Sequence, residues 1–211
     1  MDSTELWSTP TPLDPGMDLS AQRDDEAELD SKQYPYGNIL GKLVFLAGMT
    51  CPDLASSVHE LGRRAASPCM RRWRALQHVL WYLAGTLDVC IYCKTSTGHI
   101  NDGQELAGYS DSDWGNDAET RRSITEYLLL YRGAPVAWRS KQQGAVTLSS
   151  SEAEWTAMTQ GMRHCTFLRD ILGEIGVPQE PTLWYWDNKG AIRAATITGF
   201  NGRTKHLDMK L

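Results

Sequence analysis

The sequence has no apolar run long enough to span a bilayer, and its amino terminus lacks a basic stretch followed by a hydrophobic one. We therefore expect a soluble, intracellular protein without a secretory signal. Cysteine is scarce as well, and five thiols in a chain without a secretory pattern are expected to be reduced. Cys90 and Cys93 form one Cys-x-x-Cys pair, but no second pair of cysteines or histidines lies near it, so a zinc site is not predicted.

Basic residues are almost absent from the first part of the chain. Residues 1–31 carry a net charge of −8 and the whole chain −5, so the remainder carries +3. Because three prolines and few large apolar residues accompany these acids, we expect residues 1–33 to form a disordered or loosely draped leader. A mildly basic body behind an acidic leader is compatible with a nucleic-acid partner, although a charge of +3 does not require one.

Helical periodicity dominates the middle of the chain. Apolar residues recur at helical spacing from Asn38 to Ala47, and a second helix is predicted to open at Pro52 and to end before Pro68. A third amphipathic helix is predicted from Met70 to Leu83, with arginines at its start. Residues 34–86 are therefore expected to form a small helical segment.

Strand-like segments begin after Gly85 and predict a different kind of domain. The order of strand, helix, strand and helix indicates an α/β or α+β domain over residues 87–211, with a mixed sheet whose last strand joins through a helical crossover. The predicted strands are Val89–Tyr92, Leu106–Ser110, Ser123–Tyr131, Ala134–Arg139 and Leu183–Trp186, and the predicted helices are Ser151–Ile175 and Lys189–Thr196.

Three acidic positions lie at predicted element boundaries. Asp111 follows the apolar strand Leu-Ala-Gly-Tyr-Ser, Glu154 lies in the first turn of the long helix, and Asp187 follows the last strand. Asp113 and Glu152 are alternatives, since each lies two residues from one of these acids. The serines before Glu152 also fit a helix cap, which would give that glutamate a purely structural role.

Carboxylates that converge at one edge of a sheet repel one another and would need a cation. Hard oxygen ligands with open positions for phosphate suit Mg²⁺ or Mn²⁺, and two such ions can activate water in phosphodiester hydrolysis. Acids at caps and turns are also common without any function, so the spacing alone leaves both interpretations open. Trp114 and Trp155 adjoin these motifs, and their positions fit burial as well as a role in shaping a site.

Several ordered motifs resemble the ribonuclease H domain of copia-type retrotransposon polyproteins. The segments Tyr36-Gly-Asn-Ile-Leu-Gly, Cys51-Pro-Asp-Leu-Ala55 and Trp73-Arg-Ala-Leu-Gln-His resemble the connection between the reverse transcriptase and that domain. The motifs of the domain itself are Gly108-Tyr-Ser-Asp-Ser-Asp-Trp114, Arg121-Arg122-Ser123, Trp138-Arg-Ser-Lys-Gln142, Ser149-Ser-Ser-Glu-Ala-Glu-Trp155, Trp186-Asp-Asn188 and Arg203-Thr-Lys-His206.

This resemblance implies a ribonuclease H-like fold and hydrolysis of the RNA strand of an RNA–DNA hybrid. By motif, Asp111, Glu154 and Asp187 correspond to the catalytic acids that hold magnesium or manganese, with two ions in the complete domain. The hybrid and the rest of the polyprotein are the implied partners, in a cytoplasmic retroelement particle or the nucleus. The implied contacts to nucleic acid are Ser110, Asn188, Arg203, Lys205 and His206.

The sequence also departs from the family. Family members continue beyond the segment that resembles Arg203-Thr-Lys-His206 into a further strand, a helix and a fourth acidic ligand, whereas this sequence ends at Leu211. We therefore expect an incomplete domain, and a non-catalytic nucleic-acid-binding remnant of a decayed element is the alternative to an active enzyme. The paired aspartates of a polymerase site are not found in a predicted strand, since Asp24-Asp25 lies in the acidic leader.

Overall fold

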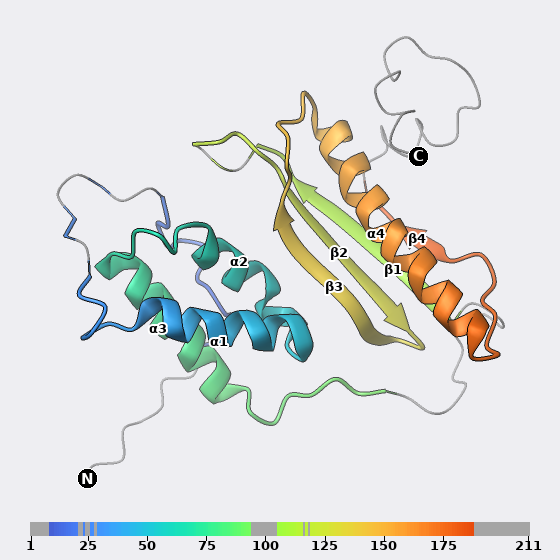
Figure 1. Cartoon of the computed structure of the whole chain (residues 1–211), viewed down its shortest axis with the longest axis horizontal. Coiled ribbons are helices and arrows are strands. Elements are labelled where there is room, and N and C mark those ends of the chain that lie inside the picture. Colours follow the sequence, from blue (N-terminus) through green and yellow to red (C-terminus); the bar gives the residue numbers. More distant parts are fainter. Residues whose placement is uncertain are drawn as a thin grey trace. The chain divides into compact units, whose positions relative to one another are not determined.

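The chain divides into two compact units, Met1–Cys90 and Ile91–Leu211 (Figure 1). The computed structural model describes residues 9–20, 23, 26–27, 29–93, 105–115, 117 and 119–187. Each unit has a hydrophobic core of its own. Among the described residues, no helix combines the length and the apolar character needed to cross a membrane.

The first unit is helical. Its elements are α1 (Tyr36–Met49), the 3₁₀ turn η1 (Pro52–Leu54), α2 (Ala55–Arg63) and α3 (Met70–Gly85). Their apolar faces meet in one core that includes Leu40, Leu61 and Leu76, as the helical spacing predicts. The predicted second helix differs in detail, because Pro52 opens a 3₁₀ turn before α2 begins.

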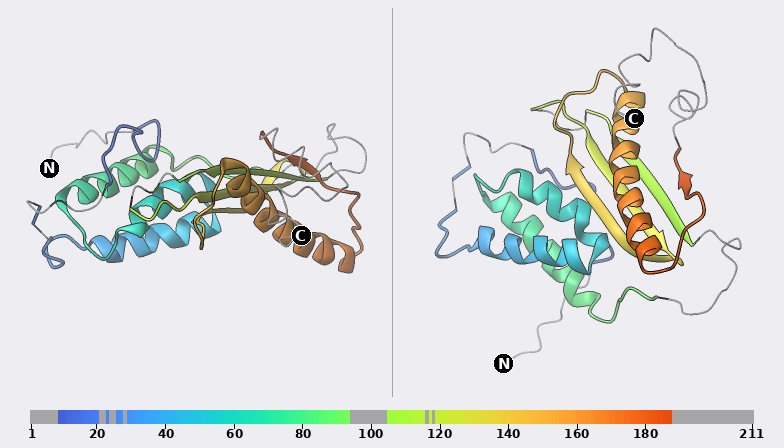
Figure 2. Two further views of the ribbon diagram at one scale, coloured as in Figure 1. Left: turned by 90° about the horizontal axis from the view of Figure 1, so that it is seen from above. Right: turned by 45° about the vertical axis from the view of Figure 1, so that its right-hand side comes forward.

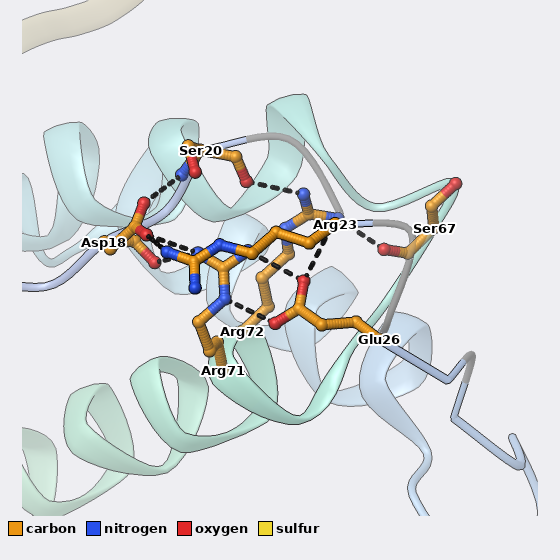
Figure 3. A network of polar contacts seen from close by, with 7 residues as sticks. All are labelled: Asp18, Ser20, Arg23, Glu26, Ser67, Arg71 and Arg72. Carbon is orange, nitrogen blue, oxygen red and sulfur yellow. Dashed lines mark hydrogen bonds and ion pairs between the residues drawn. The ribbon is translucent and has the colours of Figure 1, made fainter.

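Part of the acidic leader contacts these helices (Figure 3). Leu13, Met17 and Leu19 pack against the core of the unit. Arg71 at the start of α3 donates from Nε and Nη2 to both carboxylate oxygens of Glu26, and its Nη1 lies 2.9 Å from Asp18 Oδ2. Arg71 thus binds two carboxylates of the leader and holds the described part of it against the helices. The composition of the leader did not predict this contact.

This contact should make the stability of the first unit depend on pH. Hydrogen bonds from Ser20 and the charge of Arg71 lower the pKa of Asp18 to about 2, and the hydrogen bonds from Arg71 lower that of Glu26 to about 2. Because both pKa values are depressed in the folded state, their stabilising contribution is complete above the ordinary values and is lost as pH falls through about 2.

The measurement is the difference in free energy of unfolding between wild type and Glu26→Gln at several pH values. We expect this difference to be largest near neutral pH and to disappear toward pH 2. Asp14→Asn is the matched control, because Asp14 accepts a local hydrogen bond from Gly16 N that asparagine can also accept. A difference that stays constant over this range would contradict the prediction.

The second unit is a mixed four-stranded sheet with one long helix. The strands are β1 (Leu106–Asp113), β2 (Ile124–Tyr131), β3 (Ala134–Gln142) and β4 (Leu183–Tyr185), in the order β3-β2-β1-β4. β1 and β3 pair antiparallel with β2, and β4 pairs parallel with β1 after the crossover helix α4 (Ser150–Glu174). The predicted fold class is confirmed: a mixed α/β, ribonuclease H-like fold preceded by helices.

Helix α4 covers one face of this sheet (Figures 1 and 2). Trp184 of β4 fills the space between the sheet and the helix, and its Nε1 donates to Ser110 Oγ at 2.9 Å. A Cβ atom at Gly108 of β1 would lie 2.3 Å from the Trp184 ring, and one at Gly161 of α4 would lie 2.7 Å from it. Glycine at both positions is therefore what lets the indole fit.

The prediction of a strand at Val89–Tyr92 is wrong. These residues have no regular structure, and Val89 and Tyr92 are 70% and 73% exposed. Residues of high β-propensity form a strand only where a partner strand and a buried face are provided, and no described strand pairs with this segment. The predicted helix Lys189–Thr196 lies outside the described residues.

Candidate functional site

Three carboxylates of the second unit converge. Asp111, Glu154 and Asp187 each offer an oxygen atom, and these three atoms lie within 4.8 Å of one another. Asp111 belongs to β1, Glu154 to α4, and Asp187 follows β4 by two residues. Asp111 and Asp187 are exposed, whereas Glu154 is 6% exposed. The cluster thus lies at the surface with one acid beneath it.

The sheet register explains why the two aspartates meet. β1 and β4 run parallel, and Tyr109 pairs with Tyr185. Asp111 and Asp187 each lie two residues beyond that pair, so both side chains reach the same edge of the sheet. β3 runs in the same direction as β1, because both are antiparallel to β2, and the chain enters α4 from its end. The amino terminus of α4 therefore lies at this edge of the sheet.

A cap fixes where α4 begins, and it distinguishes the two glutamates. Ser149 Oγ accepts a hydrogen bond from Glu152 N at 3.2 Å, and Leu148 N donates to Glu152 Oε2 at 2.9 Å. Glu152 is thus part of a capping arrangement at the helix start. Glu154, two residues on, points to another side of the helix and joins the cluster.

The surroundings of Glu154 disfavour its charged form. Burial raises its pKa above the ordinary value, and the nearby charge of Asp111 raises it further, although hydrogen bonds from Trp186 and Ser112 act in the opposite direction. Trp186 Nε1 donates to Glu154 Oε2 at 3.2 Å. A cation at the cluster would offset the repulsion from Asp111 and favour the ionised form of Glu154.

Some residues predicted for the site are placed elsewhere. Asp113 ends β1 and is not part of the cluster. Ser110 is 7% exposed and accepts the Trp184 hydrogen bond, so its hydroxyl is used inside the domain. The remaining predicted nucleic-acid contacts lie outside the described residues: Asn188, Arg203, Lys205 and His206.

The sequence did not single out Trp186, the tryptophan that contacts the cluster. Trp186 bonds Glu154, and its ring lies 5.9 Å from that of Trp155 in a tilted arrangement. Trp155 is buried, whereas Trp114 is 49% exposed and donates to Thr147 O. Trp186 directly precedes Asp187 in the sequence, and a half-buried indole N–H needs an acceptor. This position could have indicated that Trp186 bonds an acid of the cluster.

The three acids form a group that could hold a metal ion. Each supplies a hard oxygen donor, and together they meet the preference of divalent cations such as Mg²⁺, Mn²⁺ and Ca²⁺ for carboxylate ligands. The positive end of the α4 dipole lies near Glu154, but a half-charge does not balance three carboxylates. Fold and cluster together define the class: a ribonuclease H-like domain with an acidic cluster at its sheet edge.

Comparisons with known proteins relate the chain to transposon polyproteins. The chain is 34% identical over 176 residues to the retrovirus-related Pol polyprotein from transposon TNT 1-94 of Nicotiana tabacum, covering 83% of the chain and 13% of that protein. It is 34% identical over 173 residues to the Pol polyprotein from transposon RE2 of Arabidopsis thaliana, covering 82% of the chain and 12% of that protein. The chain therefore spans about an eighth of the length of these polyproteins.

A shorter relative is matched along almost its whole length. The chain is 38% identical over 138 residues to the secreted RxLR effector protein 161 of Plasmopara viticola. This match covers 65% of the chain and 93% of that protein. No family model and no solved structure matches the chain. The chain belongs to the family of sequences that comprises this protein and the matching segment of the transposon Pol polyproteins.

Proposed function

We propose that this chain is the ribonuclease H part of a retrotransposon reverse transcriptase polyprotein, and that it hydrolyses the RNA strand of RNA–DNA hybrids with Mg²⁺ or Mn²⁺. The observation that supports this most is the convergence of Asp111, Glu154 and Asp187 within 4.8 Å at one edge of a ribonuclease H-like sheet. The names of the long relatives, which are Pol polyproteins of transposons, support the same function.

In this proposal the three carboxylates bind one or two divalent ions. Ions held by these carboxylates would supply activation of a water molecule and stabilisation of the leaving oxygen, and hydrolysis would leave 3′-hydroxyl and 5′-phosphate ends. Trp186 donates a hydrogen bond to one oxygen of Glu154 and so restricts the position of this carboxylate. Glu154 must be ionised to bind, so protonation competes with metal binding at low pH.

The remaining parts of the proposal concern partners. The protein would distinguish a hybrid from duplex DNA through 2′-hydroxyl contacts, with Asn188, Arg203, Lys205 and His206 near sugars and phosphates. The rest of the polyprotein would be its covalent or assembled partner, in a cytoplasmic retroelement particle or in the nucleus.

Cleavage of a labelled RNA–DNA hybrid tests the catalytic proposal. We expect metal-dependent cleavage of the RNA strand that is lost in Asp111→Asn and in Asp187→Asn, by a factor of about a thousand or more, because each substitution removes a charged ligand. Asp113→Asn is the matched control: it removes the same charge two residues along β1 and should keep most of the activity. If the folded wild-type chain shows no metal-dependent cleavage, catalysis by this chain is excluded.

A non-catalytic role is the second candidate. It is favoured by the effector protein, a short protein that consists almost entirely of the matched segment and does not carry the name of a polymerase or nuclease. In that case the fold would serve to bind nucleic acid or another protein. Salt-dependent hybrid binding without cleavage would support it, and the absence of any binding at low salt would exclude the nucleic-acid form of this role.

A further inference from the structure

The connection between β1 and β2 is fixed by a buried carboxylate. Asp117 is 4% exposed, and its Oδ2 accepts hydrogen bonds from Thr120 Oγ1 and Gln142 Nε2, both at 2.6 Å. Its Oδ1 accepts from Glu119 N at 3.1 Å, and its backbone carbonyl accepts from Arg121 N at 2.7 Å. Several donors thus surround a carboxylate that would otherwise be costly to bury, and they link Asp117 to Thr120 and Arg121.

The same connection is joined to the segment that begins α4. Gly115 N donates to Ser123 Oγ at 3.2 Å, and that hydroxyl lies 2.9 Å from Thr147 Oγ1. Trp114 Nε1 donates to the backbone carbonyl of Thr147 at 3.3 Å. Thr147 precedes the Ser149 cap by two residues. The β1–β2 connection is therefore held in place against the element that presents Glu154.

Arg121 has an unusual backbone conformation at this place. Its φ angle is 54°, in the left-handed region that glycine adopts easily and arginine rarely does. The side chain is exposed, and an ideal Cβ at Gly115 would lie 3.9 Å from its Nη2. Within the part of the chain that the structure describes, its guanidinium has no ion-pair partner. Among the described residues, Arg121 is thus held in a strained backbone conformation with a charge that no ion pair uses.

Arg121 belongs to a connection that begins at the same end of β1 as the acidic cluster. Asp113 ends β1 and pairs with Ile124, so the connection leaves the sheet at the end of β1 that carries Asp111. A cluster of three carboxylates repels a phosphodiester, and a substrate needs a positive group close by to offset that repulsion. A guanidinium suits this task, because its planar donors match two phosphate oxygens at once.

We propose that Arg121 binds a backbone phosphate of the nucleic acid next to the acidic cluster, and that the Asp117 network sets its position. The chemical class of the ligand is a phosphodiester. The inference rests on the proposed function for the nature of the substrate, but it concerns binding rather than cleavage. The contact positions the strand and carries no sequence information.

Binding of a fluorescent RNA–DNA hybrid in EDTA tests this without cleavage. We expect Arg121→Gln to weaken binding about tenfold at low salt and to reduce the slope of log K against log salt by about 0.9, the value for one phosphate contact. Arg163→Gln is the matched control, because Arg163 is an exposed arginine in α4. It should leave the slope unchanged.

A second substitution separates binding from folding. Arg121→Gly should weaken binding as much as Arg121→Gln does, while its unfolding midpoint equals or exceeds that of wild type, because glycine adopts the positive φ without strain. If Arg121→Gln and Arg163→Gln have the same salt slope, the inference is wrong even if the chain cleaves hybrids. If the chain does not cleave but its binding depends on Arg121, the proposed function fails and the inference stands.

Discussion

Replacing Glu154 with glutamine should make the metal-free protein more stable at neutral pH and should abolish its stabilisation by Mg²⁺. The carboxyl is buried beside Asp111, and its pKa is raised mainly by burial. The unfolded state therefore releases this proton at lower pH than the folded state does. As pH rises from the ordinary carboxyl range through the raised pKa, the folded state of the wild type loses stability, and glutamine removes that loss.

Metal binding should make the wild type more stable than Glu154→Gln, which is the reverse of the order expected without metal. An ion that binds the folded cluster stabilises it by about 2.7 kcal/mol when its concentration is a hundredfold above the dissociation constant. Glutamine offers a neutral oxygen and should bind the ion much more weakly. Mg²⁺ should thus stabilise the wild type and leave Glu154→Gln almost unchanged, and the effect on the wild type should grow as pH rises through the pKa of Glu154.

Thermal unfolding with and without Mg²⁺, at pH values from 4 to 8, measures both effects. Asp113→Asn is the control, since Asp113 lies outside the cluster and its variant should respond to Mg²⁺ as the wild type does. Equal responses of wild type and Glu154→Gln to Mg²⁺ would show that Glu154 is not a ligand. If the metal-free Glu154→Gln protein is less stable than the wild type at neutral pH, the charge of Glu154 does not destabilise the fold.

Gly161→Ala should destabilise the second unit by about 3 kcal/mol, although alanine is the better helix former. A Cβ at position 161 would lie 2.7 Å from the Trp184 ring and 3.2 Å from Tyr127 Cβ. The indole is fixed on its other side by Gly108 and by its hydrogen bond to Ser110, so it cannot withdraw without breaking this packing.

The same helix provides the matched control. A Cβ at Gly173 meets no atom within 4 Å, so Gly173→Ala should stabilise the unit by about 1 kcal/mol through helix propensity alone. Urea unfolding followed by circular dichroism would compare the two variants. A Gly161→Ala protein as stable as Gly173→Ala would mean that Trp184 does not occupy the space between α4 and β1.

Most of the helices and strands could be predicted from the sequence, because their signals are local. The periods of α1, α3 and α4 are visible in the spacing of apolar residues, and the capping serine before Glu152 marks the start of α4. Propensity failed at Val89–Tyr92, where strand-forming residues have no described partner strand. β1 also runs on through Asp113, so Asp111 lies within the strand and not after it.

The sequence by itself determined the class of fold and the acidic motifs from which the cluster is built, since element order and motif identity do not depend on how the elements pack. Only the tertiary structure decided which member of each acidic pair belongs to the cluster. The register of β1 against β4 places Asp111 level with Asp187, and the Ser149 cap sets the rotation of α4 that brings in Glu154 rather than Glu152. Both depend on contacts between residues far apart in the chain, including the fit of Trp184 between two glycines, and no local pattern records such contacts.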